Sequence, residues 1–158
     1  MVPGGYRWWY LDGLSDDGEH GLTLIAFIGS VFSPYYRRPR GRGASEALDH
    51  SAINIALYGK SGHRWAMTER RRGSVLQAAD SLNIGRSELR WDGSSLVAEL
   101  DELTFPWPSR IRGRLRLHPQ ALSTRVETLA EAGRHVWTPI APSARIEVDL
   151  REPKLRWS

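Results

Sequence analysis

The 158-residue sequence contains no cysteine, so it can form neither a disulfide framework nor a thiolate metal site, and a cysteine nucleophile is excluded. It also has no run of about 20 apolar residues, the length that spans a bilayer as a helix, and no signal-peptide pattern at its start. Neither Asn54 nor Asn83 lies in a glycosylation sequon. We therefore expect a soluble or peripheral protein in a bacterial cytosolic setting, with residues 1–158 forming one domain.

Nucleotide and metal chemistry have no support in the sequence. No glycine-rich loop opens a helix, no phosphate-binding loop is present, and no serine occupies the elbow motif of hydrolases. Four of the five histidines are scattered through expected turns and strand ends, without the spacing of metal ligands. They are His20, His50, His63 and His118. We expect no metal and no cofactor.

The charge of the chain is basic, with a net value of +4, and only Lys60 and Lys154 among the 22 cationic residues are not arginine. Three arginine clusters carry the excess: Arg37 to Arg42, Arg70 to Arg72, and Arg110 to Arg116. The last alternates at period two, which predicts an outward strand face, with Ile111, Gly113, Leu115 and Leu117 on the other face. Solvated surface is the simplest interpretation of each cluster, followed by attraction to anionic headgroups and then to nucleic acid.

Short runs rich in Val, Ile, Thr and aromatic residues recur between Gly, Ser, Asp and Pro, whereas helical periodicity is scarce. The turns at 15–18 and 91–94 place a glycine where a hairpin needs positive φ. We expect a loop at 37–43 and brief helical turns at 45–48 and 72–79. The predicted strands are Tyr6–Leu14, Leu22–Gly29, Asp49–Tyr58, Arg64–Thr68, Leu82–Ile84, Glu88–Trp91, Leu96–Phe105, Ile111–Leu117, His135–Ile140 and Ala144–Leu150. They predict an all-β barrel or sandwich with room for one ligand.

The first predicted strand is the most informative segment. Alternation places Tyr6, Trp8, Tyr10 and Asp12 on one face, and Arg7, Trp9, Leu11 and Gly13 on the other. Three rings therefore lead to one carboxylate, which suits an apolar tunnel with an acid at one end, because ring faces stabilise a developing cation. Ordinary core packing, with Asp12 accepting hydrogen bonds from turn amides, is the alternative.

A second candidate lies in the segment 133–142, where His135 and Trp137 share a strand face. A histidine beside an indole, followed by two prolines, suits orientation of a substrate end or proton transfer, and structural packing also explains the pair. Asn54 lies in the nearly continuous apolar run 51–57, so its amide needs a partner. It orients water or a neighbouring acid, or it makes a structural hydrogen bond.

Five segments together resemble the carotenoid 1,2-hydratase family, also called hydroxyneurosporene synthase. They are Gly4–Tyr36, Leu48–Gly59, Arg64–Arg70, Leu89–Pro108 and Gly133–Val148, and they cover nearly the whole chain. The resemblance implies a lipocalin-like antiparallel β-barrel or sandwich, the first of two such domains in the family. It also implies a hydro-lyase that adds water to the terminal double bond of an acyclic carotenoid, such as neurosporene or lycopene, without metal or cofactor.

The site residues of that family carry over in part. Proton transfer to the alkene would generate a tertiary carbocation, which water captures. The family's His-x-Trp motif, a proposed part of its active site, maps onto His135 and Trp137. Its favoured proton donor is the Asp of a Tyr-x-Asp pair that follows a Leu-Arg-Trp segment, and this sequence ends at Leu155-Arg156-Trp157-Ser158. We therefore expect the principal acid to lie in a complementary second domain, and these residues alone to be an inactive half.

Two other functions stay open. The first is a non-catalytic binding module for an apolar isoprenoid or lipid. The second is a basic barrel that binds single-stranded nucleic acid, which the placement of the aromatic residues away from the arginines disfavours. Because a carotenoid resides in a bilayer, the resemblance also implies peripheral attachment to the cytoplasmic side of a membrane, with arginine loops on anionic headgroups.

Overall fold

The computed structural model describes residues 5–30, 32–33, 36, 46–60, 62–129, 133 and 135–158. Within these ranges the all-β class is confirmed, and two short 3-10 turns lie between strands, η1 (Ala47–His50) and η2 (Arg72–Ser74). No helix among the described residues is long and apolar enough to cross a membrane. The strands are β1 (Arg7–Leu14), β2 (His20–Ile28), β3 (Ser51–Gly59), β4 (Arg64–Arg70), β5 (Val75–Gln77), β6 (Ser81–Ile84), β7 (Ser87–Trp91), β8 (Leu96–Leu103), β9 (Arg110–Pro119), β10 (Glu127–Thr128), β11 (Val136–Trp137), β12 (Ala144–Glu152) and β13 (Leu155–Trp157).

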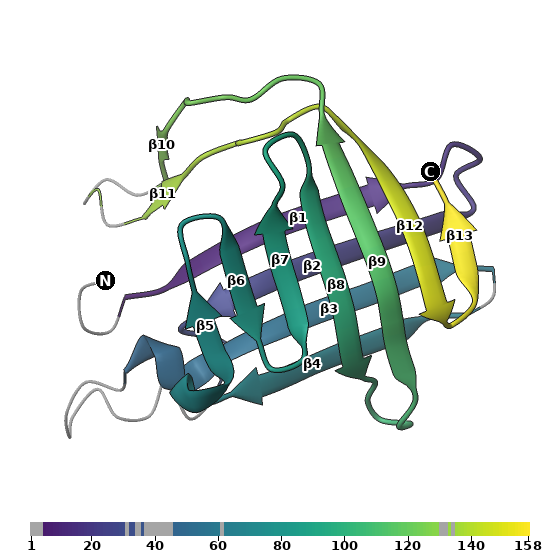
Figure 1. Ribbon diagram of the computed structural model, residues 1–158, viewed down its shortest axis with the longest axis horizontal. Helices are drawn as coiled ribbons and strands as arrows, with labels where there is room; N and C mark the ends of the chain where they lie inside the picture. Colours follow the sequence, from purple (N-terminus) through teal and green to yellow (C-terminus); the bar gives the residue numbers. More distant parts are fainter. Residues whose placement is uncertain are drawn as a thin grey trace.

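The strands form two layered antiparallel sheets and a small ribbon. One sheet has the order β1-β2-β3-β4, the other has the order β13-β12-β9-β8-β7-β6-β5, and β10 pairs with β11. Figure 1 shows the strands of the front sheet crossing those of the rear sheet steeply, as in orthogonally packed sandwiches. Of the two predicted architectures the described strands therefore form the sandwich, and they do not close into a barrel.

The core between the sheets is aliphatic. Alternation along β2 turns Leu22, Leu24, Ala26 and Ile28 inward, and they meet inward side chains of the seven-stranded sheet. The buried partners from that sheet include Leu82, Leu89, Leu100, Leu115 and Val148. The expectation of a ring-lined cavity inside the fold is wrong for the described residues: of β1, Leu11 is buried in this core, whereas Trp8, Tyr10 and Asp12 point outward.

Several predicted boundaries needed correction. The strand predicted from Asp49 begins at Ser51, because residues 47–50 form η1 first. The helix predicted for 72–79 is a single 3-10 turn followed by β5. The strand predicted for 135–140 is limited to Val136–Trp137, and the loop predicted at 37–43 lies outside the described residues. Both predicted hairpin turns are present, with φ of +70° at Gly18 and +99° at Gly93.

One carboxylate lies inside the sandwich. Glu102 on β8 is buried, accepts a hydrogen bond from the Ser87 hydroxyl at 2.7 Å, and lies 3.5 Å from the Arg70 guanidinium. Burial raises the pKa of the Glu102 carboxyl, because desolvation outweighs the attraction of Ser87 and Arg70. The folded state therefore holds this proton to a higher pH than the unfolded state does.

We expect the Glu102→Gln variant to gain free energy of unfolding relative to the wild type as the pH rises. The wild type loses the contribution of Glu102 between the pKa of the unfolded chain and the raised pKa of the folded chain, whereas glutamine does not titrate. Urea unfolding of both proteins from acidic to mildly alkaline pH measures the difference. The surface variant Glu99→Gln is the control, and a pH-independent difference for Glu102→Gln would contradict the raised pKa.

Candidate functional site

The outward side of the four-stranded sheet is the candidate functional site, and we call it the aromatic face. Strand register arranges its side chains in three rows that cross β1, β2, β3 and β4 in turn. The rows are Trp8–Phe27–Ala52–Glu69, Tyr10–Ile25–Asn54–Met67 and Asp12–Thr23–Ala56–Trp65. Four of the five candidates predicted outside the 133–142 segment therefore share one surface: Trp8, Tyr10, Asp12 and Asn54.

The floor of this face is apolar because the central strands are apolar on both sides. Phe27 and Ala52 are buried although they point away from the core, since the rings of Trp8 and Phe32 cover Phe27 at centroid distances of 6.0 and 5.5 Å. Trp8 and Tyr10 themselves keep 42% and 58% of their surface exposed. Exposed aromatic side chains gathered on one sheet face favour a binding site for an apolar ligand or partner, here with the polar Asn54 near its centre.

A histidine and a tyrosine meet at the end of the aromatic face where β1 begins. The Tyr6 hydroxyl lies 2.7 Å from Nδ1 of His135, and the two rings stack at 5.7 Å. The long connection between β9 and β12 brings His135 there, folding into the β10–β11 ribbon that lies beside the start of β1 (Figure 1). When the Tyr6 O–H donates to Nδ1, the imidazole is neutral with its proton on Nε2, which then donates toward a ligand.

Trp137 lies on the same β10–β11 ribbon. Trp137 pairs with Glu127 across β10 and β11, and about half of its surface is exposed. The backbone N–H of Leu129 donates to the carbonyl of His135 at 2.9 Å and secures the ribbon next to the histidine. The predicted pair is therefore presented on an exposed two-stranded ribbon.

A second polar pair lies at the same end of the aromatic face, and sequence reasoning missed it. Nδ1 of His50 lies 2.9 Å from a carboxylate oxygen of Glu69. Glu69 is the β4 member of the row that starts at Trp8. The ring of Tyr36 lies 5.3 Å from that of His50, and its hydroxyl donates to the carbonyl of Gly5 at 2.6 Å. Tyr36, His50 and Glu69 are far apart in the sequence, so their proximity is evident only in the folded chain.

Asn54 and Asp12 occupy different surroundings. The Asn54 carbonyl accepts a hydrogen bond from the indole N–H of Trp65 at 2.6 Å, so its amide has a partner, at the surface of the sheet and not in the core. Asp12 follows Tyr6 by six residues of extended strand, about 20 Å. The structure therefore separates the carboxylate of β1 from His135 and places the two at opposite ends of the aromatic face.

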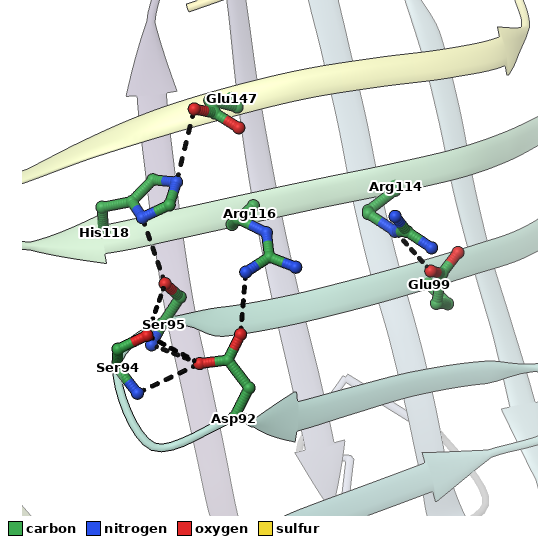
Figure 2. A network of polar contacts seen from close by, with 8 residues as sticks. All are labelled: Asp92, Ser94, Ser95, Glu99, Arg114, Arg116, His118 and Glu147. Carbon is green, nitrogen blue, oxygen red and sulfur yellow. Dashed lines mark hydrogen bonds and ion pairs between the residues drawn. The ribbon is translucent and has the colours of Figure 1, made fainter.

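The seven-stranded sheet carries a competing polar cluster on its outward side (Figure 2). One oxygen of Asp92 accepts hydrogen bonds from the N–H groups of Ser94 and Ser95 at 3.0 and 2.8 Å, and the other lies 2.7 Å from Arg116. Backbone hydrogen bonds are the main reason that the pKa of Asp92 is lowered to about 2. This carboxylate is fully engaged in closing the β7–β8 turn.

The rest of that cluster superficially resembles a hydrolase triad. The Ser95 hydroxyl lies 3.1 Å from Nδ1 of His118, and Nε2 of His118 lies 3.4 Å from Glu147. The serine is only 2% exposed, so its hydroxyl is out of reach of a substrate, and the contact to Glu147 is longer than a good hydrogen bond. We interpret the cluster as structural. Arg114 and Arg116 lie on this outward face, as their alternation predicted, and pair with Glu99 and Asp92.

Comparison with known proteins identifies relatives along the whole chain. The model of a family described as carotenoid hydratase CrtC matches residues 24–158. The chain is 59% identical over its full length to an acyclic carotenoid 1,2-hydratase of Thiocapsa roseopersicina and 55% identical to one of Rubrivivax gelatinosus. It is 42% identical over 85% of its length to one of Cereibacter sphaeroides. The chain spans 39%, 39% and 47% of these three relatives, and no solved structure matches it.

Proposed function

The chain belongs to the carotenoid hydratase CrtC family, and on that basis we propose that it binds the acyclic carotenoid in an enzyme that hydrates the terminal C=C bond. The observation that carries the proposal is the group of exposed and half-buried apolar side chains on the aromatic face, which ends at the Tyr6–His135 hydrogen bond. They include Trp8, Tyr10, Ile25 and Met67. A polyene such as neurosporene or lycopene would lie along the strands, with its reacting end at the polar end of the face.

The chemistry requires an acid, a cation-stabilising wall and one water. A proton adds to the terminal alkene, whose π electrons form the new C–H bond and leave a tertiary carbocation. The oxygen of water then forms the C–O bond and releases a proton, so that the net change is the addition of one water. Ring faces lower the energy of the cation. Competing water would be excluded only where another domain covers this face.

Each candidate residue receives a role in this proposal. His135, held by Tyr6, orients the attacking water when Nε2 carries the proton. In the other tautomer Nδ1–H donates to the Tyr6 oxygen, and the bare Nε2 accepts a proton from that water. Trp137 packs beside the reacting end, while Trp8 and Tyr10 hold the polyene. Asn54 and Trp65 keep the middle of the surface rigid through their hydrogen bond. Asp12 serves as an acid only for a carotenoid end bound at the opposite end of the face.

We propose that the principal acid comes from a complementary second domain. In the described part of the chain no carboxylate forms a hydrogen bond or an ion pair with His135. We expect the 158-residue polypeptide to bind lycopene without forming a hydroxylated product. Absorbance detects the bound polyene, and chromatography with mass detection measures the gain of one water. Hydroxylated product from the isolated chain would contradict the need for a second domain.

His135 is tested in a longer polypeptide that carries the segment following these residues in the relatives. We expect His135→Ala to lower its hydration rate by about 10²- to 10⁴-fold, the usual contribution of a general acid or base. The variant His20→Gln at the start of β2 is the matched control and should retain the rate. Equal rates for His135→Ala and the unsubstituted protein would exclude the role. Tight binding without turnover by the longer protein would favour the alternative function, a non-catalytic module for an apolar isoprenoid or lipid.

The proposal includes peripheral attachment to the cytoplasmic side of a membrane, because the substrate resides in the bilayer. The excess of arginine supports attraction to anionic headgroups, which high salt weakens. Release from membranes at high salt is the expected behaviour.

A further inference from the structure

A basic pocket lies at the end of the sandwich remote from His135. It has a volume of about 520 Å³ and is formed by the start of β4, the β8–β9 turn and the β12–β13 turn. These segments meet at the lower right of Figure 1. Four cationic side chains line the pocket against a single carboxylate, that of Glu152; they are Arg64, Arg110, Arg151 and Lys154.

The cations of this pocket are only partly neutralised. Arg110 pairs with Asp101, which is shared with Arg86, and Arg64 donates to the neutral hydroxyl of Ser109 at 2.9 Å. Neither Arg151 nor Lys154 forms an ion pair with any described residue. The pocket therefore presents excess positive charge, with guanidinium groups suited to the paired oxygens of a phosphate.

Two aromatic rings project beside the pocket from the β8–β9 turn. Trp107 is 84% exposed and Phe105 is 68% exposed, the former being the most exposed large apolar residue of those described. The turn is held in place, because the N–H of Phe105 donates to the carbonyl of Trp65 at 3.0 Å and that of Ser109 to the Thr104 hydroxyl at 2.9 Å. Exposure of an indole to water is unfavourable, and transfer of the ring into a membrane interface lowers the free energy.

We propose that this end of the molecule docks on a phospholipid bilayer, with a headgroup phosphate in the basic pocket and the rings of Trp107 and Phe105 in the interface. This names the surface for the peripheral attachment proposed above, and it is independent of the hydration chemistry. The ring of Phe105 contacts that of Trp65 at 6.4 Å, and Trp65 belongs to the aromatic face. A polyene leaving the bilayer beside the turn therefore meets the aromatic face directly.

Vesicle co-sedimentation without carotenoid tests the proposal. We expect the chain to bind vesicles of phosphatidylcholine with one-third phosphatidylglycerol, and the double variant Arg151→Gln/Lys154→Gln to bind them about 25-fold more weakly, since each cation contributes about fivefold near an anionic surface. Trp107→Ser should weaken binding about tenfold, because an inserted ring no longer leaves water. The matched control Arg72→Gln/Arg125→Gln removes the same charge from distant exposed sites and should bind as the wild type does.

Equal weakening by both double variants would show that only net charge matters and would overturn the docking site. Binding of inorganic phosphate at the pocket, with vesicle binding unaffected by Trp107→Ser, would make the pocket a soluble-anion site instead. Loss of single-stranded DNA binding in Arg151→Gln/Lys154→Gln, with no vesicle binding by the wild type, would assign the surface to nucleic acid. Because no carotenoid is present, failure of the hydration proposal leaves this result unchanged.

Discussion

Replacing Trp8 and Tyr10 together by alanine is expected to weaken carotenoid binding by about 100-fold. Both rings stand exposed on the aromatic face, and each would be covered by a bound polyene. Burying a large apolar side chain contributes about 1.5 to 3 kcal/mol, so two rings account for two orders of magnitude in Kd. The effect should concern binding and not folding, because neither ring belongs to the core between the sheets.

The measurement is a titration of detergent-solubilised lycopene followed by the change in its absorption spectrum. The control is the double variant Leu76→Ala/Leu122→Ala, which removes exposed apolar side chains away from the aromatic face. We expect its Kd to match that of the wild type, with all three proteins unfolding at similar temperatures. An equal loss in both double variants would mean that lycopene adsorbs to any apolar surface of the chain.

Replacing Gly113 by alanine is expected to destabilise the fold by about 3 to 5 kcal/mol, the range of the most damaging single substitutions. Gly113 has a φ of +147° where β9 faces the register shift of β12 between Leu150 and Glu152. A Cβ there would lie 2.4 Å from the carbonyl oxygen of Asp149 and 2.5 Å from Cα of Leu150. Both neighbours are backbone atoms, so relief requires β9 and β12 to separate.

Gly93 provides the matched control for this substitution. It also has positive φ, at +99°, but a Cβ at Gly93 would meet nothing within 4 Å. Gly93→Ala should therefore cost only the backbone strain, about 1 to 2 kcal/mol. Urea unfolding of both variants distinguishes backbone strain from the steric clash at Gly113. Equal losses of unfolding free energy would show that β9 and β12 move apart easily.

Alternation along strands predicted the faces of the fold well. The outward arginines of β9 and the outward Trp8, Tyr10 and Asp12 of β1 lie on the faces that period two assigns them. When both faces of a strand are apolar, alternation does not indicate which face turns toward the opposite sheet. The rings of β1 were expected inside, but the aliphatic rows of β2 and β3 fill the core and leave the rings outside. The apolar run of 22–28 was the signal that both faces of this sheet need apolar contacts.

The candidate site could be predicted only as separate pieces. Tyr6 and His135 each stood out in the sequence, but their hydrogen bond spans 129 positions and depends on how the β9–β12 connection folds back. The pairing of His50 with Glu69 depends equally on register between β3 and β4. Short edge strands such as β5 and β13 escaped prediction because three residues are too few to show a period.

The central claim is that the polyene lies on the outward side of the β1–β4 sheet and not between the sheets. Methyl NMR of the chain during titration with lycopene tests it most directly, because neighbouring residues of one strand report on opposite faces. We predict shifts for the methyl groups of Ile25, Ala56 and Met67, with those of Leu24 and Ile55 unmoved. Shifts concentrated on Leu24 and Ile55, with the outward methyl groups unmoved, would contradict binding on this face.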